Sequence, residues 1–216
     1  MKKIRFGFGG ILMIAALLVS DSAKILGIYF FAALLHEMGH LLMARFLKIN
    51  VKEIRFGVSG VRIVTGDRLT SYKNEILLSL AGPAVNLVGF ASVAVYFCLK
   101  GEGMHSLFLF AEDFLLSGNA EMGIQAFFAL ASLLQALTNL LPVKSFDGGR
   151  ILYCATASFA SENTAERILE ICSAFSAFLL WTVALYLMLR INAGVGIFAY
   201  SVCLIACTKH ENNYNI

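Results

Sequence analysis

The stretch FAALLHEMGHLLMARF, residues 31–46, places two histidines and a glutamate in the middle of an apolar run. If the run is helical, His36 and His40 lie on the same face, because residues four apart are one turn apart. Strongly polar side chains are costly in lipid and usually mark a function there. The stretch therefore predicts an apolar helix that directs two imidazoles toward one point.

The composition of the whole chain agrees with a membrane setting. Hydrophobic residues make up 59% of the 216 residues and charged residues only 14%, which departs far from a soluble globular protein. Short polar stretches separate the apolar ones, so the length accommodates one helical bundle and no appended soluble domain of ordinary size. We expect a single domain over residues 1–216, with no PDZ-like and no nucleotide-sensing domain.

Apolar segments long enough, or nearly long enough, to cross a bilayer as helices recur along the chain. The first follows a basic N-terminus and could be a signal peptide, but no small-x-small cleavage site closes it, so a retained helix fits better. We therefore predict about six transmembrane helices. Their ranges are 6–20, 25–46, 76–99, 122–142, 168–189 and 193–208.

The distribution of basic residues predicts the orientation. With the N-terminus inside, only Lys24, Lys100 and Arg190 fall outside, which leaves 14 of the 17 lysines and arginines on the cytoplasmic side. The reverse orientation would invert this ratio. We expect a multi-pass protein of the cell membrane with both termini in the cytoplasm, cytoplasmic loops over 47–75 and 143–167, and an acidic outer loop between the third and fourth helices.

One extramembrane stretch is typical of a β-hairpin. In VKEIRFGVSGVRIV, residues 51–64, apolar residues alternate with polar or basic ones on both sides of a glycine-containing turn. Its basic side would meet anionic lipid headgroups at the cytoplasmic face. The expected fold is thus all-α and polytopic, with a small cytoplasmic hairpin after the second helix.

The His-Glu-x-x-His pattern at residues 36–40 is typical of a metal site. Two histidines one turn apart can bind one ion, and Glu37 beside them can act as a base on water without being a ligand. Gly39 leaves room for close approach of another backbone. The alternative is a chance match, or two histidines hydrogen-bonded within a core, which the membrane setting disfavours.

A catalytic zinc site usually has three protein ligands, so two histidines leave one to find. The stretch NLLPVKSFDGGRIL, residues 139–152, interrupts the fourth apolar segment. Pro142 removes a helical hydrogen bond and the glycines allow unusual backbone angles, so Asp147 could turn back into the bundle. From these residues alone, an ordinary helix-ending turn with Asp147 capping the next helix stays open.

Three motifs together resemble the site-2 protease family of intramembrane zinc metalloproteases. They are HEMGH at 36–40, SLAGPAVNL at 79–87 and N-x-x-P-x-x-x-x-D-G-G at 139–149, in the order found in that family. The organisation is similar to the six-helix group that includes the sporulation-factor-processing protease. Many members have further prolines after the one at 142, where this chain has Val143 to Phe146.

The resemblance implies roles for individual residues. His36, His40 and Asp147 would ligate one zinc ion, and Glu37 would be the catalytic base. Three further residues would shape the active site: Asn86, Asn139 and Pro142. Gln135 and Thr138, by contrast, are expected only to make hydrogen bonds between helices.

The predicted function is zinc-dependent cleavage of a peptide bond within or near a transmembrane segment of a membrane-bound regulatory protein, as in regulated intramembrane proteolysis. The expected partners are that embedded substrate, a regulatory membrane protein and the bilayer, with no nucleic acid. Two rivals are a metal-binding transporter and a catalytically silent scaffold. The first has no use for Glu37 and more often shows repeats, and the intact glutamate argues against the second.

Overall fold

The computed structural model describes residues 3–6, 23–49, 51–57, 60–65, 71–117 and 121–191 of the chain. These ranges contain helices and one small sheet. The helices are α2 (Ala23–Phe46), α3 (Tyr72–Leu99), α4 (Met104–Ser117), α5 (Glu121–Asn139), α6 (Asp147–Ala157) and α7 (Glu162–Ile191). The strands are β1 (Lys3–Phe6), β2 (Val51–Gly57) and β3 (Gly60–Thr65).

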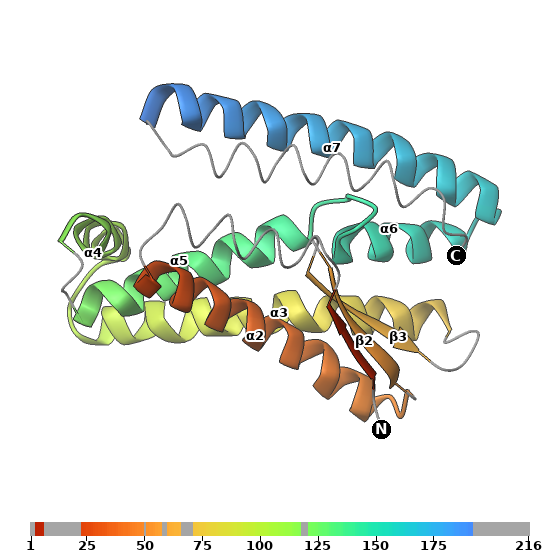
Figure 1. Ribbon diagram of the computed structural model, residues 1–216, viewed down its shortest axis with the longest axis horizontal. Coiled ribbons are helices and arrows are strands. Elements are labelled where there is room, and N and C mark those ends of the chain that lie inside the picture. Colours follow the sequence, from red (N-terminus) through yellow and green to blue (C-terminus); the bar gives the residue numbers. More distant parts are fainter. Residues whose placement is uncertain are drawn as a thin grey trace.

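Helix α3 is the centre of the arrangement. It packs against α2, α4, α5 and α6, while α2 also packs against α5, and α7 packs on α6 (Figure 1). The histidines of α2 and the start of α6 therefore both lie against α3. Helices that are distant in sequence meet around this central helix, as a site built from several motifs requires.

Three of the described helices are long and apolar enough to cross a membrane. The qualifying segments are Gly27–Phe46 in α2, Tyr72–Leu99 in α3 and Met122–Asn139 in α5. Large apolar side chains point outward from them: Leu42, Val88 and Leu134 are each more than half exposed. Outward apolar faces around a polar interior are what a lipid solvent favours, so the structure agrees with a membrane protein.

The predicted spans can be compared with these helices one by one. The ranges 25–46, 76–99 and 122–142 correspond to α2, α3 and α5, although α5 ends at Asn139. The range 168–189 lies within α7, whose passage through the membrane stays a prediction. The ranges 6–20 and 193–208 lie outside the described residues apart from Phe6, so the total of six spans stays a prediction as well.

Two stretches that we expected to be loops contain helices. Helix α4 occupies the predicted outer loop, and α6 occupies part of the predicted loop 143–167. At 14 and 11 residues, both are too short to meet a membrane-spanning length, which was the criterion applied to the sequence. A stretch between two spans can contain a short helix that tertiary packing stabilises, so the assignment of these stretches to the two sides of the membrane stays a prediction.

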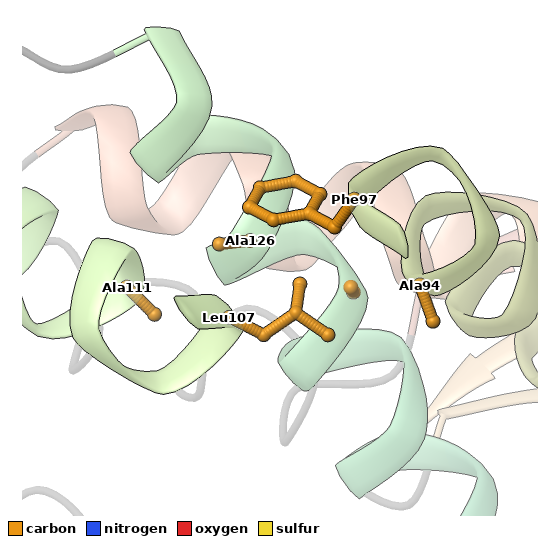
Figure 2. Close-up of a cluster of buried hydrophobic side chains, with 6 residues drawn as sticks. Ala94, Phe97, Leu107, Ala111 and Ala126 are labelled. Carbon is orange, nitrogen blue, oxygen red and sulfur yellow. The ribbon is translucent and has the colours of Figure 1, made fainter. Parts of the chain in front are cut away.

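The core between α3, α4 and α5 explains how α4 is held. Leu107 and Ala111 of α4 pack with Ala94 and Phe97 of α3 and with alanines of α5 (Figure 2). Phe97 and Leu107 are fully buried. Because most of the other residues are alanines, the three helices approach closely around these two large side chains.

The strands form a three-stranded sheet in the order β1-β2-β3. Strands β2 and β3 are antiparallel, with Gly57 opposite Gly60, in the stretch where the sequence predicts a hairpin. Strand β1 pairs parallel to β2, with Lys3 opposite Glu53. This third strand was not anticipated, because a parallel partner from the chain start leaves no local pattern in four residues.

Candidate metal centre

The two histidines of α2 lie at its crossing with α3. His36 and His40 are 5% and 7% exposed, and their rings meet nearly edge to face with centroids 4.8 Å apart. The crossing is close because Gly39 has no side chain: a Cβ there would lie 2.6 Å from the Ala81 carbonyl oxygen. The close backbone approach that was predicted at Gly39 is therefore made by α3.

Asp147 reaches the same point from α6, which packs on α3 as α2 does. It is the first residue of α6, whose N-cap position is occupied by Phe146 and has no side-chain cap hydrogen bond. The Asp147 carboxylate instead faces the histidines, with Oδ2 3.1 Å from His36 Nε2 and 3.3 Å from His40 Nε2. The alternative in which Asp147 only caps its own helix is thus not the observed arrangement.

The glycine pair after Asp147 permits the tight turn into α6. A Cβ on Gly148 would collide with the Leu140 carbonyl, and one on Gly149 would collide with the Val143 carbonyl. The first turn of α6 therefore lies directly against the backbone of segment 140–144. Any larger residue at either position would force the helix start and that segment apart.

Segment 140–146 is in turn fixed to α7. Val143 and Phe146 are buried and pack with Leu180 of α7. The Lys144 backbone N–H donates to Ser173 Oγ of α7 at 3.1 Å. The third candidate ligand is consequently held by segment 140–146 and α7, together with α3 on which α6 packs, whereas the two histidines lie on α2 where it crosses α3.

The three candidate ligand atoms form a nearly equilateral triangle. His36 Nε2 and His40 Nε2 are 3.2 Å apart, and the two distances to Asp147 Oδ2 are 3.1 and 3.3 Å. Tetrahedral zinc with bonds of about 2.0–2.1 Å places its ligand atoms about 3.3–3.4 Å apart. The spacing and the His-His-carboxylate donor set therefore fit one zinc ion, and this is the only such group of three found among the described residues.

Space for an ion is kept open by Gly82 of α3. A Cβ on this glycine would lie 2.7 Å from His36 Nε2 and closer still to His40 Nε2. The two ligand nitrogens thus lie next to a residue that has no side chain. A side chain at this position would fill the place that an ion would take.

His40 is oriented by a backbone group. Its Nδ1 donates to the Leu78 carbonyl oxygen at 2.7 Å, so its Nε2 keeps a lone pair for the centre of the triangle. Such a hydrogen bond fixes both the tautomer and the ring direction of a metal-binding histidine. The acceptor lies in the turn before Pro83, which cannot donate to the Ser79 carbonyl.

The charge state of Asp147 also suits a ligand. Burial raises the pKa of its carboxyl, but hydrogen bonds with His36 and His40 outweigh this effect, so the pKa lies below its ordinary value. Asp147 lies outside the three spanning helices. Its carboxylate is ionised at neutral pH, as metal binding requires.

The other predicted site residues differ in how closely they approach this triangle. Glu37 follows His36 and is partly buried, with carboxylate Oε2 enclosed by the protein. Asn86 is 1% exposed, and its Nδ2 lies 3.4 Å from His36 Nδ1. Asn139 ends α5 and Pro142 lies in the segment before Asp147. Their chemical roles stay predictions.

One buried residue joins the site although the sequence assigned it no role there. Gln135 of α5 is 5% exposed and accepts a hydrogen bond from Asn86 Nδ2 at 3.1 Å, so it is one side chain away from His36. The expectation of a hydrogen bond between helices is confirmed for Gln135. It is wrong for Thr138, whose hydroxyl donates to Leu134 and Gln135 carbonyls of its own helix.

Comparison with known proteins identifies the family of this chain. The family model described as Peptidase family M50 matches residues 24–183, which include both histidines, Glu37 and Asp147. The chain belongs to Peptidase family M50. This match confirms the resemblance that the three motifs indicate, and membership in M50 implies a protease.

The fold is similar to that of a solved structure. The chain is similar to the Site-2 Protease from Methanocaldococcus jannaschii, with a TM-score of 0.62 and 17% identity over 100% of this chain and 94% of that one. At this identity the likeness concerns the fold. The comparison with curated proteins gives no match. Family and fold together support a membrane metalloprotease of the M50 type.

Proposed function

We propose that this protein is a zinc-dependent intramembrane endopeptidase. The observation that carries the proposal is the triangle of His36, His40 and Asp147, with edges of 3.1–3.3 Å beside the open position at Gly82. These three residues would hold one zinc ion per chain. When bound, the ion supplies a Lewis acid that polarises the scissile carbonyl and makes water more acidic.

Glu37 is the residue that moves protons in this proposal. Glu37 follows His36 in α2, its Oε2 is enclosed by the protein, and it is not one of the three candidate ligands. It accepts a proton from the attacking water and returns it to the leaving amine, so the same carboxylate serves as base and then as acid. The hydrogen bond from His40 Nδ1 to the Leu78 carbonyl keeps the His40 ring in place during this transfer.

The proposed substrate is a transmembrane segment of a membrane-bound regulatory protein. The triangle lies among the apolar helices α2 and α3, so a substrate reaches it from the membrane. A protease acts on extended chain, and the sheet has edge strands, β1 and β3, to which an unwound segment could add by backbone hydrogen bonds. We further propose cytoplasmic access for water and cytoplasmic termini, on the strength of the basic residues.

The test separates the base from the ligands. Purified protein should hold about one zinc per chain, measured by elemental analysis. Glu37→Gln should keep that zinc and lower cleavage of a co-expressed single-span membrane protein by roughly 10²–10⁴-fold, since only a base is removed. Loss of zinc in this variant would make Glu37 a ligand, and unchanged cleavage would remove it from the mechanism.

A further inference from the structure

A hydrogen-bonded bridge leaves α2 and returns to it through two other helices. Gln135 Nε2 of α5 donates to the Tyr29 carbonyl oxygen at 3.1 Å, and Gln135 Oε1 accepts from Asn86 Nδ2 of α3 at 3.1 Å. Asn86 then meets His36 Nδ1. Tyr29 and His36 are seven residues apart on α2, hence on one face of it. The chain of contacts thus starts at Tyr29 and ends at His36, both on α2.

The direction of this bridge is determined at its first bond. The Tyr29 carbonyl can only accept, so Gln135 has to turn its NH₂ group toward Tyr29 and its oxygen toward Asn86. Asn86 must then turn Nδ2 toward Gln135. An Asn86 amide turned over would place oxygen against oxygen. Asn86 Oδ1 is left over, buried and without a hydrogen-bond partner among the described residues.

His36 needs this leftover oxygen when it binds a metal through Nε2. A neutral imidazole that ligates through Nε2 carries its proton on Nδ1, and that N–H requires an acceptor. Nδ2 of Asn86 cannot accept, and at 3.4 Å its contact with Nδ1 is longer than a good hydrogen bond. Rotation of the Asn86 amide that keeps Nδ2 on Gln135 can instead turn Oδ1 toward His36.

We infer that Gln135 is a positioning residue for the metal centre: it holds Nδ2 of Asn86 on its own side and thereby directs Oδ1 to His36. The inference rests on the zinc site proposed above and adds a residue outside the three motifs. A rival explanation is that Gln135 only ties α5 to α2 and α3, as buried amides often do in membrane proteins. The two explanations predict different zinc affinities when residue 86 ends in two oxygen atoms instead of one oxygen and one nitrogen.

An aspartate at position 86 provides that difference, because a carboxylate offers an acceptor in either direction and needs no orienting partner. The experiment measures zinc affinity, by competition with a chelator, for Gln135→Met with Asn86 and with Asp at position 86. We expect Gln135→Met to weaken zinc binding about tenfold next to Asn86. It should cause no such loss in the Asn86→Asp background, where Gln135 Oε1 would face a carboxylate oxygen instead of an amide donor. Comparing within each background removes the general attraction of the added charge for zinc.

Gln125→Met is the matched control, since Gln125 lies on the same helix and is exposed. It should bind zinc like the wild type. The absorption bands of bound Co²⁺ give a second readout. They should change when Gln135→Met is made in the wild type, and the double variant should have the same bands as the Asn86→Asp protein. Equal weakening by Gln135→Met in both backgrounds would assign Gln135 a purely structural role, and no weakening beside Asn86 would remove it from the site.

A measurement on the wild-type protein stands even if these variants do not fold. The chain has only two glutamines, Gln125 and Gln135, so labelling glutamine side-chain amides with ¹⁵N gives two signals. Adding zinc should shift the Gln135 signal and leave the Gln125 signal in place. A zinc-loaded protein with both signals unmoved would overturn the inference alone. A protein that takes up no zinc would overturn the proposed function instead.

Discussion

The two sides of the candidate metal centre are constructed differently. His36 and His40 come from one turn of one helix, and their spacing follows from helical geometry. Asp147 comes from the start of a short helix whose position depends on segment 140–146 and on α7. The comparison teaches that two ligands are set by local periodicity and the third by tertiary packing. Substitutions on the two sides should therefore differ in severity.

Removing the helical pair should have the largest effect. His36→Ala together with His40→Ala leaves one carboxylate, which cannot hold zinc in this setting, so elemental analysis of the purified protein should find none. Zinc at the wild-type level in this double variant would contradict the site.

Removing Asp147, the ligand positioned by tertiary packing, should have the second largest effect. Asp147→Ala leaves two histidines, and we expect zinc affinity to fall at least about 100-fold, beyond the loss typical of residues that only support a ligand. Glu112→Ala is a suitable control, since Glu112 is exposed on α4 and lies outside the cluster. Chelator competition measures both. An Asp147→Ala protein with unchanged affinity would show that the third ligand lies elsewhere.

The comparison also shows which features could be read from the sequence. The shared face of His36 and His40 needed only helical periodicity, and the two rings do meet on one side of α2. Asp147 needed family resemblance, because its residues alone favoured a helix cap. Gln135 was underrated because its position beside Asn86 depends on how α3 and α5 pack, and helix α4 and the pairing of β1 with β2 depend on contacts distant in sequence.

Filling the open position at Gly82 should affect the helical side without removing a ligand. In Gly82→Ala the new methyl group would meet both ligand nitrogens, so we expect zinc affinity to fall roughly 10–100-fold while the fold persists. Gly89→Ala on the same helix makes only ordinary contacts, the nearest at 3.6 Å to Phe128, and should bind zinc normally. Equal affinities for the two variants would mean that the ion does not lie beside Gly82.

The smallest effect is expected where the Asp147 side can relax. In Gly149→Ala the added Cβ meets the Val143 carbonyl, and segment 140–146 has to shift to admit it. This segment is irregular, unlike the α2–α3 crossing, so part of the strain can be absorbed away from the site. We expect zinc binding to weaken by about tenfold or less, as for a residue that only supports a ligand. Gly103→Ala, where a Cβ meets nothing within 4 Å, is the control. A loss as large as that of Asp147→Ala would show that the packed side of the centre is as rigid as the helical one.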